Sequence, residues 1–106
     1  MFFEFREYRI KNGQRARWVE FMESTIIPFQ ISKGMVVVGS FVGEKEEDLY
    51  FWVRRFDSEA QREQLYKDVY ETAEWQEKIK PLIDEMLDRS SIKVMRLEPT
   101  PKSVIR

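Results

Sequence analysis

The sequence of 106 residues contains no cysteine and no histidine. Without cysteine the chain has no disulfides, no thiolate metal ligands and no cysteine nucleophile. Without histidine, Ser-His-Asp and Cys-His catalysis are excluded, together with the commonest protein ligands of metal ions and haem. We therefore expect no metal ion and no other cofactor, and any chemistry would depend on carboxylates, tyrosines, arginines and aromatic surfaces.

The chain also lacks long apolar runs and concentrated charge. No apolar stretch approaches the roughly 18 residues of a membrane-spanning helix, and the opening Met-Phe-Phe-Glu-Phe-Arg is charged where a signal peptide would be apolar. The 18 basic and 19 acidic residues balance, and no basic cluster exceeds Arg54-Arg55, so binding to nucleic acid is not expected. We predict a cytoplasmic protein with neither a nucleic-acid nor a membrane partner.

What remains is a composition typical of one globular domain, with 42% hydrophobic and 35% charged residues. In chain order, residue patterns predict a strand at 2–10, a helix from 14 that kinks or ends near 25–27, strands at 35–42 and 49–56, a two-piece helix at 59–89 and a strand at 92–97. We expect residues 1–98 to form a single domain and residues 99–106 to form a C-terminal tail.

Local signals mark where the helices begin and where they are interrupted. Pro28 and Pro81 lie inside the helical patterns and should bend or restart each helix. Ser58, with Gln61 three residues later, fits a capping box, and Thr72 can cap the second piece of the long helix. The element order β-α-β-β-α-β is the ferredoxin-like motif, an α+β fold with a four-stranded antiparallel sheet in the spatial order 4-1-3-2.

In this fold both helices cover one face of the sheet, so the other face should be polar. The strand at 35–42 instead has seven apolar or glycine residues among eight, which predicts burial on both faces. An uncovered apolar face of this size is typical of a contact surface. We therefore predict a homodimer in which two sheets pack face to face.

Several short motifs resemble those of NIPSNAP-like proteins, and their order and spacing cover residues 2–98. They are Phe3-Glu4-Phe5-Arg6-Glu7-Tyr8, Asn12-Gly13, Trp18, Pro28, Gly34, Gly39, Phe41, Trp52, Asp57-Ser58, Arg62, Ala73-Glu74-Trp75 and Pro81. The resemblance implies the dimeric α/β-barrel superfamily, which includes cofactor-free monooxygenases, lactone isomerases, dehydratases and haem proteins. Members often carry a histidine after the first helix and another in the third strand. This chain has Ser32-Lys33 and Tyr50-Phe51 there, which argues against histidine-dependent chemistry and haem ligation.

A candidate ligand site combines alternate residues of the first and third strands. Its members are Glu4, Arg6, Tyr8, Tyr50, Trp52 and Arg54. We expect these strands to be parallel neighbours with aligned pleats, so that all six side chains share one face. Apolar walls with a few convergent polar groups are typical of a small-molecule site, and Trp52 could stack on a flat apolar ligand.

Each polar member has a candidate role. Arg6 or Arg54 could hold a carboxylate, enolate or phenolate through two hydrogen bonds. Tyr8 or Tyr50 could donate to a developing oxyanion or pass a proton. Burial would raise the pKa of Glu4 and Arg6 would lower it, and the balance decides whether Glu4 could act as a base.

Two functions remain open at this point. The first is binding of a small apolar or aromatic metabolite in a cleft between sheet and helices, with or without cofactor-free monooxygenase- or isomerase-like chemistry. The second is a non-enzymatic interaction or scaffold module, in which Glu4, Arg6 and Arg54 form ion pairs at the homodimer interface. Arg62 could cap its helix or line the mouth of the cleft.

Overall fold

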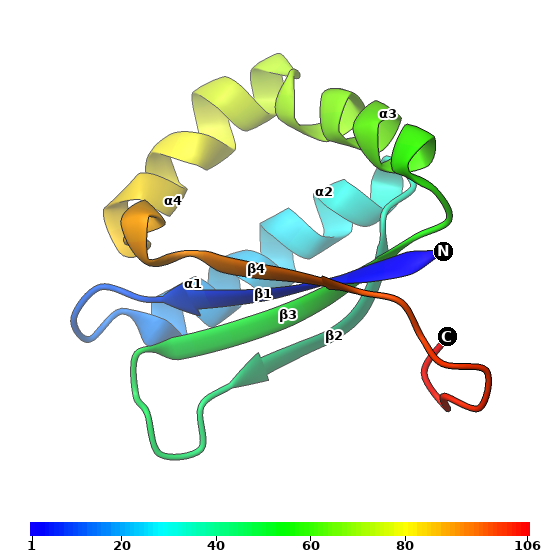
Figure 1. Ribbon diagram of the computed structural model, residues 1–106. Coiled ribbons are helices and arrows are strands. Elements are labelled where there is room, and N and C mark those ends of the chain that lie inside the picture. Colours follow the sequence, from blue (N-terminus) through cyan, green and yellow to red (C-terminus); the bar gives the residue numbers. More distant parts are fainter.

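Four strands form one antiparallel sheet in the order β2-β3-β1-β4 (Figure 1), in a computed structural model that describes residues 1–106. The strands are β1 (Phe2–Arg9), β2 (Val36–Val42), β3 (Leu49–Phe56) and β4 (Lys93–Leu97). The helical segments are α1 (Arg15–Phe21), the π turn η1 (Met22–Ile26), α2 (Ile27–Ser32), α3 (Glu59–Tyr70), the π turn η2 (Glu74–Ile79), α4 (Lys80–Met86) and the 3-10 turn η3 (Arg89–Ser91). This arrangement confirms the predicted ferredoxin-like α+β fold and its strand order.

The central strands β1 and β3 are antiparallel, so the expectation that they run parallel is wrong. The first crossover returns β2 in the direction of β1, and the hairpin between β2 and β3 then reverses the chain. The pleats nevertheless align, because the register pairs Glu4 with Arg54, Arg6 with Trp52, and Tyr8 with Tyr50. All six candidate residues therefore share one face of the sheet, as predicted.

Strand β2 is an edge strand, and its prediction as a strand buried on both faces is wrong for the single chain. Val36 is 45% exposed and Phe41 is 57% exposed, because they pair with Arg55 and Phe51 on the face that no helix covers. A bulge interrupts the pairing between Val37 and Gly39. A Cβ atom at Gly39 would lie 2.6 Å from the Phe41 ring, so only glycine fits this position without moving that ring.

Both long helical segments continue through their prolines by means of a π turn. Pro28 lies in the first turn of α2, directly after η1, and Pro81 lies in the first turn of α4, directly after η2. The N–H of Ile27 donates to the carbonyl of Met22, and the N–H of Lys80 to that of Trp75. Proline lacks an N–H and crowds the carbonyl four residues earlier, and the wider turn relieves this conflict. The predicted irregularity near residues 25–27 is therefore a π turn and not a helix end.

The predicted caps are confirmed. The Ser58 side-chain oxygen accepts a hydrogen bond from the Gln61 N–H at 3.0 Å, and the Gln61 side chain accepts one from the Asp57 N–H at 2.6 Å. The Thr72 hydroxyl oxygen accepts from the Trp75 N–H at 3.1 Å. These caps fix where α3 begins and where the chain turns into η2, and so determine which helical side chains face the sheet.

All the helices lie over one face of the sheet, and no helix covers the opposite face, called the bare face below, which the C-terminal tail borders at Phe3 and Phe5 (Figure 1). The buried core, which includes Trp18, Phe56 and Val69, lies between the helices and the covered face. None of the helices combines the length and the apolar character that a membrane span needs, and the cytoplasmic location stays a prediction. After β4 the tail makes one turn, in which the Ser103 N–H donates to the Thr100 carbonyl.

Candidate functional site

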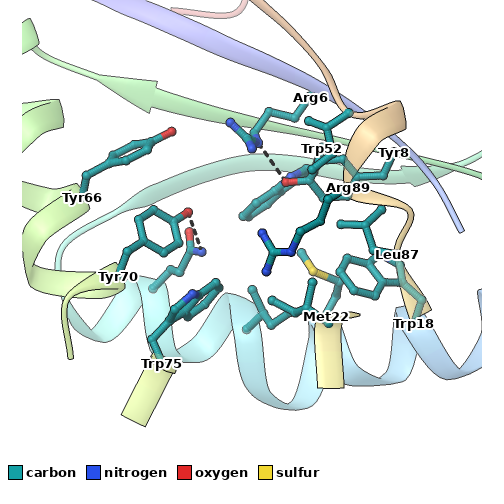
Figure 2. Close-up of a pocket in the computed structure, with 14 residues that line it drawn as sticks. Arg6, Tyr8, Trp18, Met22, Trp52, Tyr66, Tyr70, Trp75, Leu87 and Arg89 are labelled. Carbon is teal, nitrogen blue, oxygen red and sulfur yellow. Dashed lines mark hydrogen bonds between the residues drawn. The ribbon is translucent and has the colours of Figure 1, made fainter. Parts of the chain in front are cut away.

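A cavity of about 240 Å³ lies between the helices and the covered face of the sheet. Eleven of its fourteen lining residues are hydrophobic, and all three tryptophans of the chain are among them. Figure 2 shows Trp18, Met22 and Trp75 at the cavity, opposite Arg6 and Trp52 of the sheet. Both π turns contribute to the wall, Met22 through η1 and Trp75 through η2. The interruptions of the two helices therefore shape the cavity.

The cavity opens to solvent along the β4 edge of the sheet. Val94 pairs in register with Arg6 on the covered face, yet it is 47% exposed, so no helix covers the sheet at this point. Arg89 of η3 lines the cavity and reaches across it in Figure 2. The side chain of Arg89 is 46% exposed and is ion-paired with Asp84 of α4. A ligand would therefore enter between β4 and the segment from α4 to η3.

The six predicted site residues divide into two groups. Arg6, Tyr8 and Trp52 line the cavity. Glu4, Tyr50 and Arg54 lie on the same face and are buried away from the cavity wall. The three residues of the first group stay candidates for ligand binding, and those of the second have contacts within the protein that account for them.

Glu4 is fully buried and receives hydrogen bonds from three side chains. Arg54 Nη2 lies 2.7 Å from Glu4 Oε1, and Arg62 Nε lies 2.6 Å from Glu4 Oε2. The Tyr66 hydroxyl donates to the carboxylate at 2.8 and 2.9 Å. The carboxylate therefore serves as an anchor that joins β1 and β3 to α3.

These contacts also settle the protonation of Glu4. Burial has the largest single effect and raises the pKa of Glu4, but the charge of Arg54 and hydrogen bonds from Arg62, Tyr66 and Arg54 together outweigh it. The pKa of Glu4 therefore lies below its ordinary value. Arg54, not Arg6, supplies the opposing charge, because Arg6 Nη1 lies 3.8 Å from Glu4 Oε1. Glu4 is ionised and both of its carboxylate oxygens already accept hydrogen bonds, so it is unsuited to act as a base near neutral pH.

Arg54 is fully buried and holds the layers together. Its Nη1 donates to the Gln30 side-chain oxygen at 2.9 Å and to the Tyr70 hydroxyl at 2.7 Å. Its Nη2 donates to Glu4 and to the Tyr66 hydroxyl, each at 2.7 Å. Because both terminal nitrogens of Arg54 already donate to protein groups, Arg54 cannot bind a ligand through a pair of hydrogen bonds, which distinguishes it from Arg6.

The charged residues lie on the wrong face to join two sheets. Glu4 and Arg54 point toward the helices, where Tyr66 and Tyr70 of α3 contact them. The interpretation of Glu4, Arg6 and Arg54 as ion pairs at a sheet-to-sheet interface is therefore wrong. Their pairing belongs to the interior of one chain.

Tyr50 is buried and away from the cavity as well. Its hydroxyl shares a 2.5 Å hydrogen bond with the Ser40 hydroxyl of β2. Burial raises the pKa of Tyr50 to about 12, as it does that of Tyr66. Both phenols stay protonated at neutral pH, so they are donors and not bases.

Sequence reasoning missed several residues that helices bring to this face. They are Gln30, Tyr66, Tyr70, Trp18 and Trp75, of which all five line the cavity. A signal for two of them was present: Arg62, Tyr66 and Tyr70 follow one another at intervals of four, which places three polar-tipped side chains on one face of α3. The role of Arg62, open from the sequence, is to bind Glu4 from that helix.

Comparisons with known proteins agree with this fold. The structure is similar to protein Atu4242 from Agrobacterium tumefaciens, with a TM-score of 0.89, 23% identity and complete coverage of both chains. It is also similar to the NIPSNAP family protein Atu5224 from the same organism, with a TM-score of 0.87, 22% identity and coverage of 99% and 98%. An uncharacterized NIPSNAP domain protein from Burkholderia xenovorans gives a TM-score of 0.85 at 16% identity, with coverage of 96% and 97%.

At these identities the structural likeness establishes the fold alone. Atu4242 is itself described as a NIPSNAP family protein with unknown function. The curated proteins contain no match to this chain. A family model described as NIPSNAP matches residues 3–102, nearly the whole sequence. The chain therefore belongs to the NIPSNAP family.

Proposed function

We propose that this protein binds a small apolar or aromatic metabolite in the cavity between its helices and its sheet. The observation that carries the proposal is the cavity itself, about 240 Å³ in volume and lined mostly by hydrophobic side chains. A dry apolar cavity of about 150 Å³ is large enough for benzene. The present cavity suits a molecule of one substituted ring or a short branched chain.

The side chains support binding more strongly than catalysis. Glu4 is the buried carboxylate of this face, and its three hydrogen-bonding partners and lowered pKa deprive it of basicity. Cofactor-free monooxygenase- or isomerase-like reactions need a group that removes a proton. Because Glu4 is unsuited to that step, we assign the cavity a binding role.

Indole N–H signals in NMR spectra test the proposal, because all three tryptophans line the cavity. Titration with benzyl alcohol, benzoate, phenylacetate and cyclohexanol should give saturable shifts of these signals for at least one probe. A cavity-filling variant, Ile83→Phe, should abolish the shifts, and Ile31→Ala, which changes an exposed residue of α2, should preserve them. Unchanged indole signals with every probe would contradict the proposal.

We also propose that the bare face of the sheet pairs with a second copy of the chain. Exposed apolar side chains gather on or beside this face, namely Val36, Val38, Phe41, Met95 and Leu97. Acidic and basic residues lie together at its rim, where Glu7 is within ion-pair distance of both Arg9 and Lys93. A face with an apolar centre and both charge signs at its edge is complementary to itself, as a two-fold interface requires.

A further inference from the structure

The proposed binding function leaves open the chemical class of the ligand, and the donors around the cavity narrow it. We propose that the cavity takes a small aromatic or branched aliphatic carboxylate, and that Arg6 holds its carboxylate group. This inference rests on the proposed binding function. It concerns which ligand the cavity selects and which residue selects it.

The covered face carries more basic than acidic side chains around Glu4. Three guanidinium groups, those of Arg6, Arg54 and Arg62, surround the single carboxylate of Glu4. Arg54 and Arg62 bind Glu4 at 2.7 and 2.6 Å, and Arg62 has Glu59 as a second partner at 3.3 Å. Glu59 is also paired with Arg96, so basic groups outnumber acids here, and Arg6, at 3.8 Å, is the most distant of the three from Glu4.

Arg6 has terminal donors that no protein acceptor uses. Its Nε donates to the Tyr8 hydroxyl at 2.8 Å, which fixes the orientation of the guanidinium. Its Nη1 approaches Glu4 no closer than 3.8 Å, beyond hydrogen-bond range. The side chain is only 17% exposed and borders the cavity (Figure 2). A largely buried cation whose terminal nitrogens make no hydrogen bond to an anion is costly, so an anion placed beside it is favoured.

The cavity wall has a further donor without an acceptor, the Tyr70 hydroxyl. The Tyr70 hydroxyl accepts from Arg54 at 2.7 Å and from Gln30 at 3.3 Å, which leaves its own hydrogen to donate. A wall that offers donors in excess recognises acceptor oxygens, and a carboxylate has two of them.

The apolar side chains of the wall indicate the chemical nature and size of the rest of the ligand. Met22, Trp75 and Ile83 line the cavity away from the sheet. The Trp75 ring meets the Tyr70 ring edge-on, with centroids 4.7 Å apart, so this part of the wall is aromatic. The volume of about 240 Å³ admits a single ring with a one- or two-carbon acid group.

The test compares two probes of nearly equal shape, benzoate and benzyl alcohol, by titration of the indole signals at neutral pH. We expect the wild type to bind benzoate at least about tenfold more tightly. Arg6→Met should remove this preference and leave the affinity for benzyl alcohol within about twofold of wild type. Arg17→Met removes the same charge from an exposed pair with Glu85, outside the cavity, and should leave the preference intact.

The outcomes separate the two proposals. Equal binding of both probes by the wild type, or an unchanged preference in Arg6→Met, would overturn the assignment of a carboxylate to Arg6 while leaving the binding function standing. If Arg17→Met lost the preference for benzoate to the same extent, the assignment to Arg6 would also be overturned, because long-range charge would then explain the preference. Binding of neither probe, nor of the wider panel, would overturn the binding function itself. Circular dichroism of Arg6→Met, and the intermediate preference expected of Arg6→Lys, exclude misfolding as the cause.

Discussion

At the scale of single residues, Glu4 is the point where the sheet and α3 are joined by charge. It is the one carboxylate among three guanidinium groups on the covered face. A buried ion pair adds little net stability compared with a well-packed apolar pair, but loss of one partner leaves an uncompensated charge. Substitution of Glu4 should therefore lower the free energy of unfolding far more than substitution of an exposed acid.

We expect Glu4→Gln to lower the free energy of unfolding by about 3 to 5 kcal/mol, because it leaves Arg54 buried without an anion. Urea denaturation measures this change. Glu85→Gln removes an acid from an exposed pair with Arg17 and should cost no more than about 1 kcal/mol. Similar losses in the two variants would show that Glu4 is not an anchor.

The lowered pKa of Glu4 predicts how stability depends on acid. The unfolded carboxyl takes up its proton near the ordinary pKa of 4.5, and the folded one only at lower pH. The unfolded state then binds more protons, so the contribution of Glu4 is complete above pH 4.5 and is lost as pH falls through the folded pKa. Thermal unfolding from pH 6 to pH 3 should show this loss. A profile equally steep in Glu4→Gln would assign the acid sensitivity to other carboxyls.

Buried phenols predict the opposite behaviour in alkali. Tyr50 and Tyr66 have pKa values raised to about 12 by burial, whereas an unfolded tyrosine ionises near 10. The stability contributed by keeping these phenols neutral is complete below pH 10 and is lost as pH rises toward 12. Absorbance of tyrosinate should show late-titrating groups in the folded protein. One of them should vanish in Tyr50→Phe, a variant that should fold because the hydroxyl partner Ser40 is exposed.

At the scale of secondary structure, local chemistry predicted most elements. The strand order and the caps at Ser58 and Thr72 followed from alternation and short-range hydrogen bonding. The π turns did not follow from local chemistry. A proline inside a helix shows that one backbone hydrogen bond is lost, but not how the folded chain accommodates that loss. The exposure of β2 in the single chain was missed, because an apolar pattern shows that a strand needs to be covered without showing whether the same chain supplies the cover.

The candidate site, too, could be predicted from the sequence only in part. A period of two placed the six strand residues on one face, even though the assumed parallel direction was wrong. Which of these side chains face the cavity depends on how the helices pack. Tyr66 and Tyr70 of α3 accept hydrogen bonds from the terminal nitrogens of Arg54, whereas Arg6 donates only through Nε, to Tyr8. Spacing within a strand carries no information about such contacts between layers.

The helix cap at Thr72 provides a test at this scale. Thr72→Ala removes the acceptor of the Trp75 N–H and should lower the free energy of unfolding by about 1 kcal/mol. Thr100→Ala, in the exposed C-terminal tail, is a matched control and should be neutral within about 0.5 kcal/mol. Equal effects of the two substitutions in urea denaturation would contradict a capping role for Thr72.

At the scale of the whole molecule, the sheet divides the chain into a covered side and a bare side (Figure 1). The covered side holds the cavity, and the bare side holds the exposed apolar cluster of β2 and β4. Pairing through the bare side would leave the β4-edge mouth on the other side of the sheet from the interface. The proposed assembly and the proposed ligand binding would therefore use different surfaces.

Sedimentation at micromolar concentration tests the proposed dimer. The wild type should sediment with twice the chain mass of 12.9 kDa, and Phe41→Glu should sediment as a monomer, because it places a charge among the exposed apolar side chains of this face. Ile31→Glu introduces the same charge at an equally exposed apolar residue of α2 and should stay dimeric. A monomeric wild type, or dissociation by both variants, would refute pairing through the sheet.

The π turns also make the cavity sensitive to chain length. Each π turn holds one residue more than a regular turn would need, and successive residues of an α-helix are about 100° apart around its axis. Deleting one residue from η1 would restore a regular helix and rotate α1 by that angle relative to α2. Trp18 would then leave the cavity wall while Gln30 kept its place. Insertions and deletions at η1 and η2 would thus change which side chains form the cavity wall and the core beside it.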